Sequence, residues 1–205
     1  MTLRTSKTVL HSPVLILAGD IGRFCDYDKY RDFLKIVCNA YELVLLVAGN
    51  EFSREEGLEV AERLVCEPSL QGKLRFLNRG RVDIPESNVT VLGCTLHSHI
   101  SPDYTALTND FERIKNWSVK AHNEEHAKDP QWLKASLKDI VKNEPQRKVV
   151  VVTHYAPLFQ GVAHPMNENN ALAQCFSSSA LDEVRREVNM PSASSWIFGT
   201  LLVVR

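Results

Sequence analysis

The chain has 205 residues, a formal net charge of −1 and 44% hydrophobic residues, values typical of a soluble globular protein. The near-neutral charge gives no support for a nucleic-acid or anionic-membrane partner. Because no window approaches 18 uninterrupted apolar residues, no membrane span is predicted. Five cysteines without paired spacing favour free thiols in a reducing compartment, which predicts a cytoplasmic protein.

Strands and helices alternate in the first third of the predicted structure. Val14–Ala18 and Leu43–Ala48 are unbroken β-prone runs, as expected for strands that are covered on both faces. Between them, apolar residues from Tyr30 to Tyr41 recur at helical spacing. Ser53 and Glu56 have the spacing of a capping box and predict the start of a second helix.

The rest of the chain continues the alternation. The remaining predicted elements, in chain order, are strands at Leu74–Leu77 and Val89–Cys94 around a turn-rich segment, a polar helix over Asn109–Lys128, a further helix from Asp129-Pro130, a buried strand at Val149–Thr153, a long loop over Tyr155–Ser178, a short helix near Leu181–Val188 and a last strand from Trp196. This order predicts one α/β domain that spans residues 1–205.

Three of the predicted strands end on a small polar or metal-binding side chain. The first ends on Gly19-Asp20, the second on Gly49-Asn50 and the strand at 149–153 on Thr153-His154. Because ligands of open α/β sheets bind at the carboxyl ends of the strands, Asp20, Asn50 and His154 are predicted to share one site. Carboxylate, amide oxygen and imidazole together suit a divalent metal such as Mn, Fe or Zn. The alternative is that Gly-Asp and Gly-Asn are ordinary turns and that the histidine is packed in the core.

The order of these motifs resembles that of the calcineurin-like metallophosphoesterases, from about Val14 to Gly199. That family carries D-x-H, G-D-x-x, G-N-H-[E/D], a lone histidine after a strand, and G-H-x-H. The resemblance implies a four-layer α/β/β/α sandwich with a two-metal site that activates a water for attack on phosphorus. It also implies that Asp20 bridges the metals and that Asn50 and His154 are ligands of one of them.

The chain departs from the family pattern at three places. Glu51 stands where the family has the histidine after Gly-Asn, and Gly199 is followed by TLLVVR instead of H-x-H. Residues 1–19 contain no Asp or Glu, which leaves His11 as the only candidate ligand there. The expectation is therefore a truncated domain, incomplete at both ends, that binds one metal weakly and hydrolyses phosphate esters poorly. The alternatives are a non-catalytic scaffold or binding module derived from the family, and an unrelated α/β binding protein.

Other histidines and the C-terminal segment allow further hypotheses. His122 and His126 are spaced i and i+4, which can chelate zinc, but the segment also reads as a plain polar helix. His97 and His99 share one face if that segment is a strand. His164 lies in the long loop, where it is predicted to contact substrate unless it serves only in turns. The apolar segments Trp196–Phe198 and Leu201–Val204 predict self-association through an exposed last strand.

Overall fold

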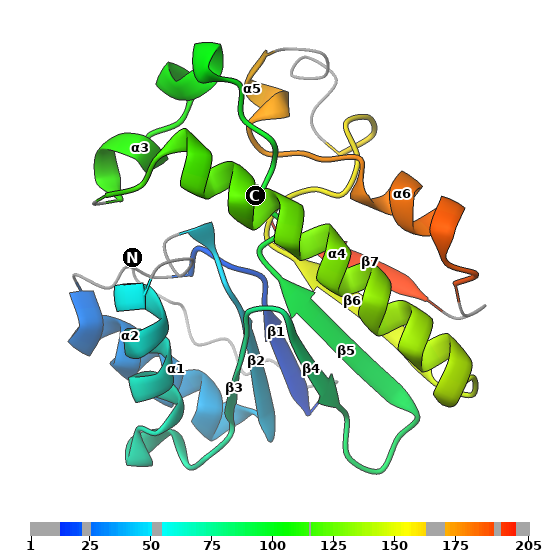
Figure 1. Ribbon diagram of the computed structural model, residues 1–205. Coiled ribbons are helices and arrows are strands. Elements are labelled where there is room, and N and C mark those ends of the chain that lie inside the picture. The colour runs from blue at the N-terminus through cyan, green and yellow to red at the C-terminus, as the bar shows by residue number, and fades with distance from the viewer. Residues whose placement is uncertain are drawn as a thin grey trace.

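The computed structural model describes residues 13–21, 26–50, 55–114, 116–162, 171–190 and 194–199. It is a mixed α/β structure with two sheets (Figure 1). The strands are β1 (Val14–Leu17), β2 (Leu43–Val47), β3 (Leu74–Leu77), β4 (Gly80–Asp83), β5 (Val89–Cys94), β6 (Lys148–Thr153) and β7 (Ser195–Phe198). The helices are α1 (Tyr27–Ala40), α2 (Glu55–Val65), η3 (Pro68–Leu70), η4 (Pro102–Leu107), α3 (Asp110–Arg113), α4 (Val119–Asn143), α5 (Ala171–Gln174) and α6 (Ala180–Glu187).

The first sheet is parallel and has the strand order β1-β2-β3. Its middle strand, β2, is buried on both faces. Val44 and Leu46 pack with side chains of α1 and α2, whereas Leu45 and Val47 point to the opposite face and pack with the second sheet. Because successive side chains of a strand point to opposite faces, an unbroken run of apolar residues fills two cores at once.

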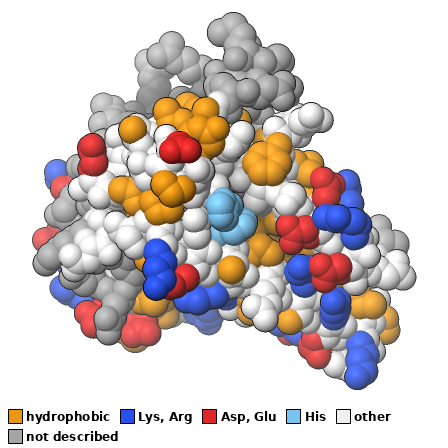
Figure 2. Space-filling model, turned by 45° about the horizontal axis from the view of Figure 1, so that its top comes forward, with side chains coloured by type: hydrophobic (Ala, Val, Ile, Leu, Met, Phe, Trp, Pro, Cys, Tyr) orange, Lys and Arg blue, Asp and Glu red, His pale blue; other side chains and the backbone are white. Residues whose placement is uncertain are grey.

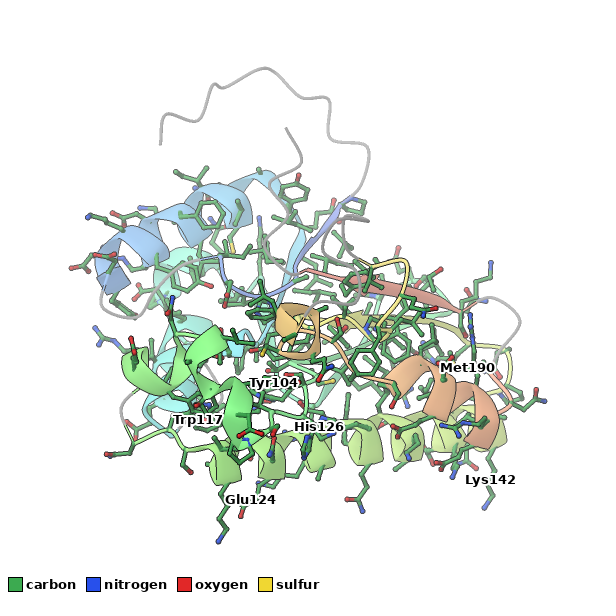
Figure 3. All side chains as sticks on the ribbon, turned by 90° about the horizontal axis from the view of Figure 1, so that it is seen from above. Tyr104, Trp117, Glu124, His126, Lys142 and Met190 are labelled. Carbon is green, nitrogen blue, oxygen red and sulfur yellow. The ribbon has the colours of Figure 1, made fainter. Side chains whose placement is uncertain are left out.

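The second sheet has the order β4-β5-β6-β7. The pair β4–β5 is antiparallel, whereas β5–β6 and β6–β7 are parallel. A core cluster joins this sheet to α4 and α6, with Leu133, Leu137 and Ile140 of α4 packed beside Val149 and Val151 of β6. Seen from above, α1 and α4 lie on opposite sides of the molecule with the strands between them (Figure 3).

The two sheets approach each other closely at Gly93, near the carboxyl end of β5. A Cβ placed on Gly93 would lie 2.7 Å from the Cβ of Leu77 and 2.8 Å from its Cδ1. Both distances are shorter than a van der Waals contact, so only glycine fits without a shift of the first sheet. Thr95 ties the sheets at the same end, because its Oγ1 donates a hydrogen bond of 2.9 Å to the Ala48 carbonyl.

Replacing Gly93 by alanine is expected to lower the free energy of unfolding by about 1–3 kcal/mol, the usual cost of overpacking a core. Urea unfolding at neutral pH measures the effect. Gly72 is a suitable control for the loss of a glycine, because a Cβ there would meet nothing within 4 Å. Gly72 has a φ of +66°, a backbone conformation that asparagine adopts more readily than alanine. Gly72→Asn is therefore a better control than Gly72→Ala. Equal stability of Gly93→Ala and the wild type would contradict the close approach of the sheets.

Two predicted helices prove to be one. The structure has a single helix α4 over Val119–Asn143 with Pro130 inside it, instead of a helix that ends near Lys128 and another that begins at Asp129-Pro130. The prediction was wrong because Pro130 was taken as a helix start. Proline cannot donate a hydrogen bond to the His126 carbonyl, but the side chains that α4 buries on both sides of Pro130, including His122 and Leu133, hold the helix together.

Strand β4 was not predicted. It lies inside the segment read as turns, and its sequence GRVD has a single apolar side chain. Pairing with β5 forms the strand, in the register Gly80↔Gly93 to Asp83↔Thr90. Thr90 Oγ1 donates to Asp83 Oδ1 at 2.7 Å, so the polar residues of β4 have partners across the pair. Ser53 of the predicted capping pair and the segment Leu201–Val204 fall outside what the structure describes, whereas Glu56 lies in the first turn of α2.

Strand β7 ends the second sheet. It pairs with β6, and none of the described strands pairs with its other side. Ile197 of β7 is exposed. Self-association along this edge stays a prediction. Within the described ranges, every helix is too short or too polar to cross a membrane.

Candidate functional site

The carboxyl ends of β1 and β6, which belong to different sheets, meet beside Ala18. The Nδ1 atom of His154, just after β6, lies 3.1 Å from the Ala18 carbonyl oxygen, just after β1. The Nε2 atom of the same ring lies 3.4 Å from Oδ2 of Asp20. Asp20 and His154, which are 134 positions apart in the sequence, are therefore neighbours in the fold.

The hydrogen-bond partners of His154 fix its tautomer. A carbonyl oxygen can only accept, so Nδ1 of His154 carries the proton and donates it to Ala18. In the neutral ring, Nε2 is then an acceptor, and it faces a carboxylate oxygen of Asp20, which is also an acceptor. Two facing acceptors repel each other unless a proton or a cation lies between them. The geometry of this pair is thus suited to binding a cation.

Two glycines allow these groups to approach. Gly19 has a φ of +88°, and a Cβ there would overlap Nδ1 of His154. A Cβ on Gly49 would overlap Oδ1 of Asp20 and lie 2.8 Å from its backbone nitrogen. Asp20 itself has a φ of +47°, a left-handed conformation that aspartate tolerates better than most residues. The Gly-Asp and Gly-Asn sequences therefore do more than form turns, because they place Asp20 between His154 and the end of β2.

Asn50 follows Gly49 and is held by a residue that the sequence did not indicate. Its Nδ2 donates a hydrogen bond of 2.7 Å to Oδ1 of the buried Asp110, at the start of α3. Its Oδ1 is buried and has no hydrogen-bond partner among the described residues. The other oxygen of Asp110 accepts a hydrogen bond of 3.2 Å from the Tyr155 hydroxyl. Burial, and after it the negative charge of Asp110, raises the pKa of Tyr155 well above its ordinary value, so the hydroxyl stays a donor.

The structure thus brings Asp20 and His154 together, and Asn50 follows Gly49, the residue on which a Cβ would overlap Asp20. A search of the described ranges finds no group of three or more His, Cys, Asp or Glu side chains that could hold a metal. The candidate site contains two residues of these types, Asp20 and His154, and the Asn50 amide oxygen is a candidate third donor. His11, Glu51 and His164 lie outside the described residues, so their predicted roles stay predictions.

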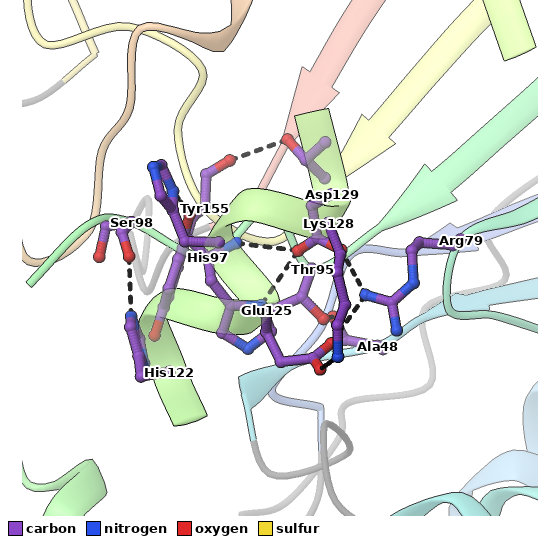
Figure 4. Close-up of polar contacts among 12 residues, drawn as sticks. Ala48, Arg79, Thr95, His97, Ser98, His122, Glu125, Lys128, Asp129 and Tyr155 are labelled. Carbon is purple, nitrogen blue, oxygen red and sulfur yellow. Dashed lines mark hydrogen bonds and ion pairs between the residues drawn. The ribbon is translucent and has the colours of Figure 1, made fainter. Parts of the chain in front are cut away.

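The buried His97 and His122 and the half-buried His126 form a cluster between α4 and the segment after β5, in which Figure 4 labels His97 and His122. His122 Nε2 donates to the Ser98 carbonyl at 2.9 Å, and His126 Nδ1 donates to the His97 carbonyl at 2.6 Å. Asn123, between them, donates to and accepts from the backbone of Ile100. The i, i+4 histidines of the predicted polar helix therefore fasten a loop to α4 in this structure.

A buried carboxylate completes this cluster. Oδ2 of Asp129 accepts from the His97 backbone N–H at 3.1 Å and lies 3.0 Å from the ring Nδ1 of His97. Oδ1 of Asp129 lies 2.7 Å from Nη1 of Arg79, which follows β3. The ring of His97 also packs against Tyr155, with 5.9 Å between the ring centroids. The cluster therefore contacts the candidate site through Tyr155, which packs against His97, binds Asp110 and directly follows His154.

On the face that Figure 2 presents, hydrophobic side chains form several separate patches, and most basic residues lie close to acidic ones. Leu107, Phe159 and Leu172 are among the large hydrophobic residues that the structure leaves exposed. Ion pairs such as Lys134–Glu187 and Arg81–Glu144 combine opposite charges at the surface. The prediction that nucleic acid is not a partner is not tested by this distribution and stays a prediction.

The chain is similar to a known protein in structure but not detectably in sequence. No family model matches the chain, and no curated protein matches it in sequence. The structure is similar to the crystal structure of phosphopantetheinyl hydrolase (PptH) from Mycobacterium tuberculosis, with a TM-score of 0.58 and 16% sequence identity. The similarity covers 94% of this chain and 73% of that chain. At this identity the two proteins are shown to share a fold.

Proposed function

We propose that the chain is a metal-dependent phosphoric ester hydrolase of the calcineurin-like phosphoesterase family, with one weakly bound cation and little turnover. The observation that carries the proposal is the pair of acceptors at the strand ends, where Nε2 of His154 faces a carboxylate oxygen of Asp20. The shared fold with a phosphopantetheinyl hydrolase supports the class of reaction. The proposal includes a single calcineurin-like domain with the four layers α/β/β/α. Its three interfaces would be the cluster between the first sheet and α1 and α2, the cluster between the two sheets, and the cluster between the second sheet and α4 and α6.

The donor set fits a divalent cation. Asp20 supplies a carboxylate, His154 an imidazole whose other nitrogen is fixed on a carbonyl, and Asn50 a buried amide oxygen without a partner in the described part of the chain. Metal-binding histidines commonly donate their second N–H in this way, because the bond fixes the tautomer and orients the ring. These oxygen and nitrogen donors suit Mn, Fe or Zn. A bound divalent cation would supply Lewis-acid stabilisation of charge on a phosphate ester.

The same donor set explains why turnover is proposed to be slow. Catalytic sites normally hold a metal with at least three protein ligands, and enzymes of phosphate-ester chemistry frequently use two metals. The described site offers three donors, the minimum for one cation and too few for a second, and Glu51 replaces the histidine that the family places after Asn50. A non-catalytic binding module with the same cation site is the alternative, which Glu51 favours.

The test is a pair of measurements on the purified chain with Mn²⁺. Isothermal titration is expected to show one weak site per chain, and Asp20→Ala is expected to abolish it, since the variant removes the carboxylate that faces His154. At ten times its Kd, a cation that binds the folded state alone adds about 1.4 kcal/mol to the free energy of unfolding. A rise of the melting temperature with Mn²⁺ is therefore expected in the wild type and not in Asp20→Ala.

Hydrolysis of an aryl phosphodiester in excess Mn²⁺ separates the enzyme from the binding module. Asp32→Ala is the matched control, because Asp32 is an exposed carboxylate of α1 whose described ion pair is with the adjacent Arg31. Slow hydrolysis that Asp20→Ala abolishes and Asp32→Ala leaves intact would support the proposal, and binding without hydrolysis would support the module. Rapid hydrolysis lost in Asp20→Ala would show that the site is not impaired, and absence of Mn²⁺ binding would refute both functions.

A further inference from the structure

The Asp110 carboxylate binds two residues that flank the candidate cation site. Its Oδ1 accepts from Asn50 Nδ2 at 2.7 Å, and its Oδ2 accepts from the Tyr155 hydroxyl at 3.2 Å. The backbone N–H of Asp110 donates to Thr108 Oγ1 at 3.2 Å, which helps to fix the start of α3. Asp110 is buried, and it lies 60 positions from Asn50 in the sequence.

The chemistry of this contact determines which way the Asn50 amide is turned. The two ends of an asparagine amide have nearly the same shape but opposite hydrogen-bonding roles, because Nδ2 only donates and Oδ1 only accepts. An ionised carboxylate only accepts, so only Nδ2 can face Asp110. The Asn50 Oδ1 is then directed away from Asp110, and it is a buried acceptor that no described residue satisfies.

A buried acceptor without a partner is costly in a folded protein, commonly about 1–3 kcal/mol, unless a ligand or water satisfies it. Asn50 follows Gly49, the residue on which a Cβ would overlap Oδ1 of Asp20. A cation beside Asp20 and His154 is a suitable partner for this oxygen, because hard divalent cations bind amide oxygens.

We infer that Asp110 is a positioning residue that holds the Asn50 amide with its oxygen toward the cation and its nitrogen away from it. This inference rests on the proposed function. Without Asp110, the amide can turn over and present Nδ2, whose partial positive charge would repel a cation. Asp110 also holds the hydroxyl of Tyr155, the residue that follows His154, and so connects two of the three proposed ligands.

A substitution series with Mn²⁺ as the probe tests the inference. Asp110→Asn keeps the shape of the side chain but can donate as well as accept, so it no longer dictates the orientation of Asn50. Its affinity for Mn²⁺ is expected to fall about 10–100-fold, as is usual when the hydrogen-bond partner of a metal ligand is changed. Asp103→Asn is the matched control, since it makes the same chemical change on an exposed residue of η4, and its affinity is expected to equal that of the wild type.

Exchange of the two side chains provides a rescue. Asn50→Asp alone places two carboxylates at hydrogen-bond distance and is expected to destabilise the chain. In Asn50→Asp with Asp110→Asn, the new asparagine donates to the new aspartate, which offers oxygen to the cation in either orientation. The double variant is therefore expected to regain the affinity that Asp110→Asn loses. Failure of Asp110→Asn to weaken binding, or the same weakening in Asp103→Asn, would overturn the inference.

A readout without metal keeps this test separate from that of the proposed function. The side-chain amide protons of Asn50 can be observed by NMR and assigned from their absence in Asn50→Ala, which adds no other side-chain amide. The inference predicts that one of them is protected from exchange in the wild type and loses that protection in Asp110→Asn. Unchanged protection would overturn the positioning role. Absence of Mn²⁺ binding in the wild type, with the protection as predicted, would instead refute the proposed function.

Discussion

Replacing Asp129 by alanine is expected to lower the free energy of unfolding by about 3–5 kcal/mol, the usual cost of breaking a buried ion pair from one side. The carboxylate is fully buried in α4 and binds Arg79 and the backbone and ring of His97. Its removal leaves the N–H groups of His97 without their acceptor in a region that water does not reach. Urea unfolding at pH 7 measures the loss.

The matched control for Asp129 is a carboxylate that pairs with arginine at the surface. Glu144 lies 2.7 Å from Nη2 of Arg81 and 2.8 Å from Nε of Arg147. Ion pairs of this kind contribute little to stability because water screens them, so Glu144→Gln is expected to unfold close to the wild type. A similar loss in both variants would show that the burial of Asp129 is not what makes it important.

The stability of the wild type is expected to decrease by about 3 kcal/mol between pH 7 and pH 4 because of His122 alone. Burial, and after it the nearby His97, lowers the pKa of His122 to about 3, compared with about 6.5 in an unfolded chain. As the pH falls below 6.5, the unfolded chain takes up this proton and the folded chain does not. The contribution of His122 is therefore fully present above pH 6.5 and is lost progressively as the pH falls towards 3.

His122→Gln isolates this contribution from other groups that titrate in acid. The Nε2 of glutamine can still donate to the Ser98 carbonyl, which His122 binds in the wild type, but glutamine does not titrate. Urea unfolding of both chains at several pH values gives the difference directly. The wild type is expected to lose about 3 kcal/mol more than the variant over this range. Parallel stability curves would show that His122 takes up its proton as readily when folded as when unfolded.

The buried strands could be predicted because each is encoded by a continuous run of apolar residues. The runs at 14–18, 43–48 and 149–152 are apolar at every position, and the structure places β1, β2 and β6 there with side chains in the cores. The same regularity put Asp20, Asn50 and His154 at strand ends. Strand β4 has no such pattern. It forms because its backbone pairs with that of β5, a residue-to-residue pairing that the sequence of β4 does not indicate.

The contacts that organise the site could not be read from spacing. Asp110 and Asn50 are 60 positions apart, Arg79 and Asp129 are 50 apart, and neither pair has a local signature. Asp129 was read as the start of a helix because it precedes proline. In the structure its carboxylate is the centre of a buried network. Such roles depend on which loops the fold brings to α3 and α4, and these long-range contacts cannot be predicted from the periodicity of the sequence.

The two sheets meet at Ala18, and this contact affects how a bound cation should change local unfolding of the chain. The Ala18 carbonyl accepts from His154, and a Cβ on Gly199, after β7, would lie 2.9 Å from the same oxygen. Asp20 follows a strand of the first sheet and His154 follows a strand of the second. A molecule in which the two sheets have separated locally therefore has no intact cation site. Because a ligand stabilises only states that retain its site, Mn²⁺ should slow amide hydrogen exchange in β2 and β6 by the same factor. Amides that exchange through smaller openings, such as those of α6, should exchange at the same rate with or without the ion.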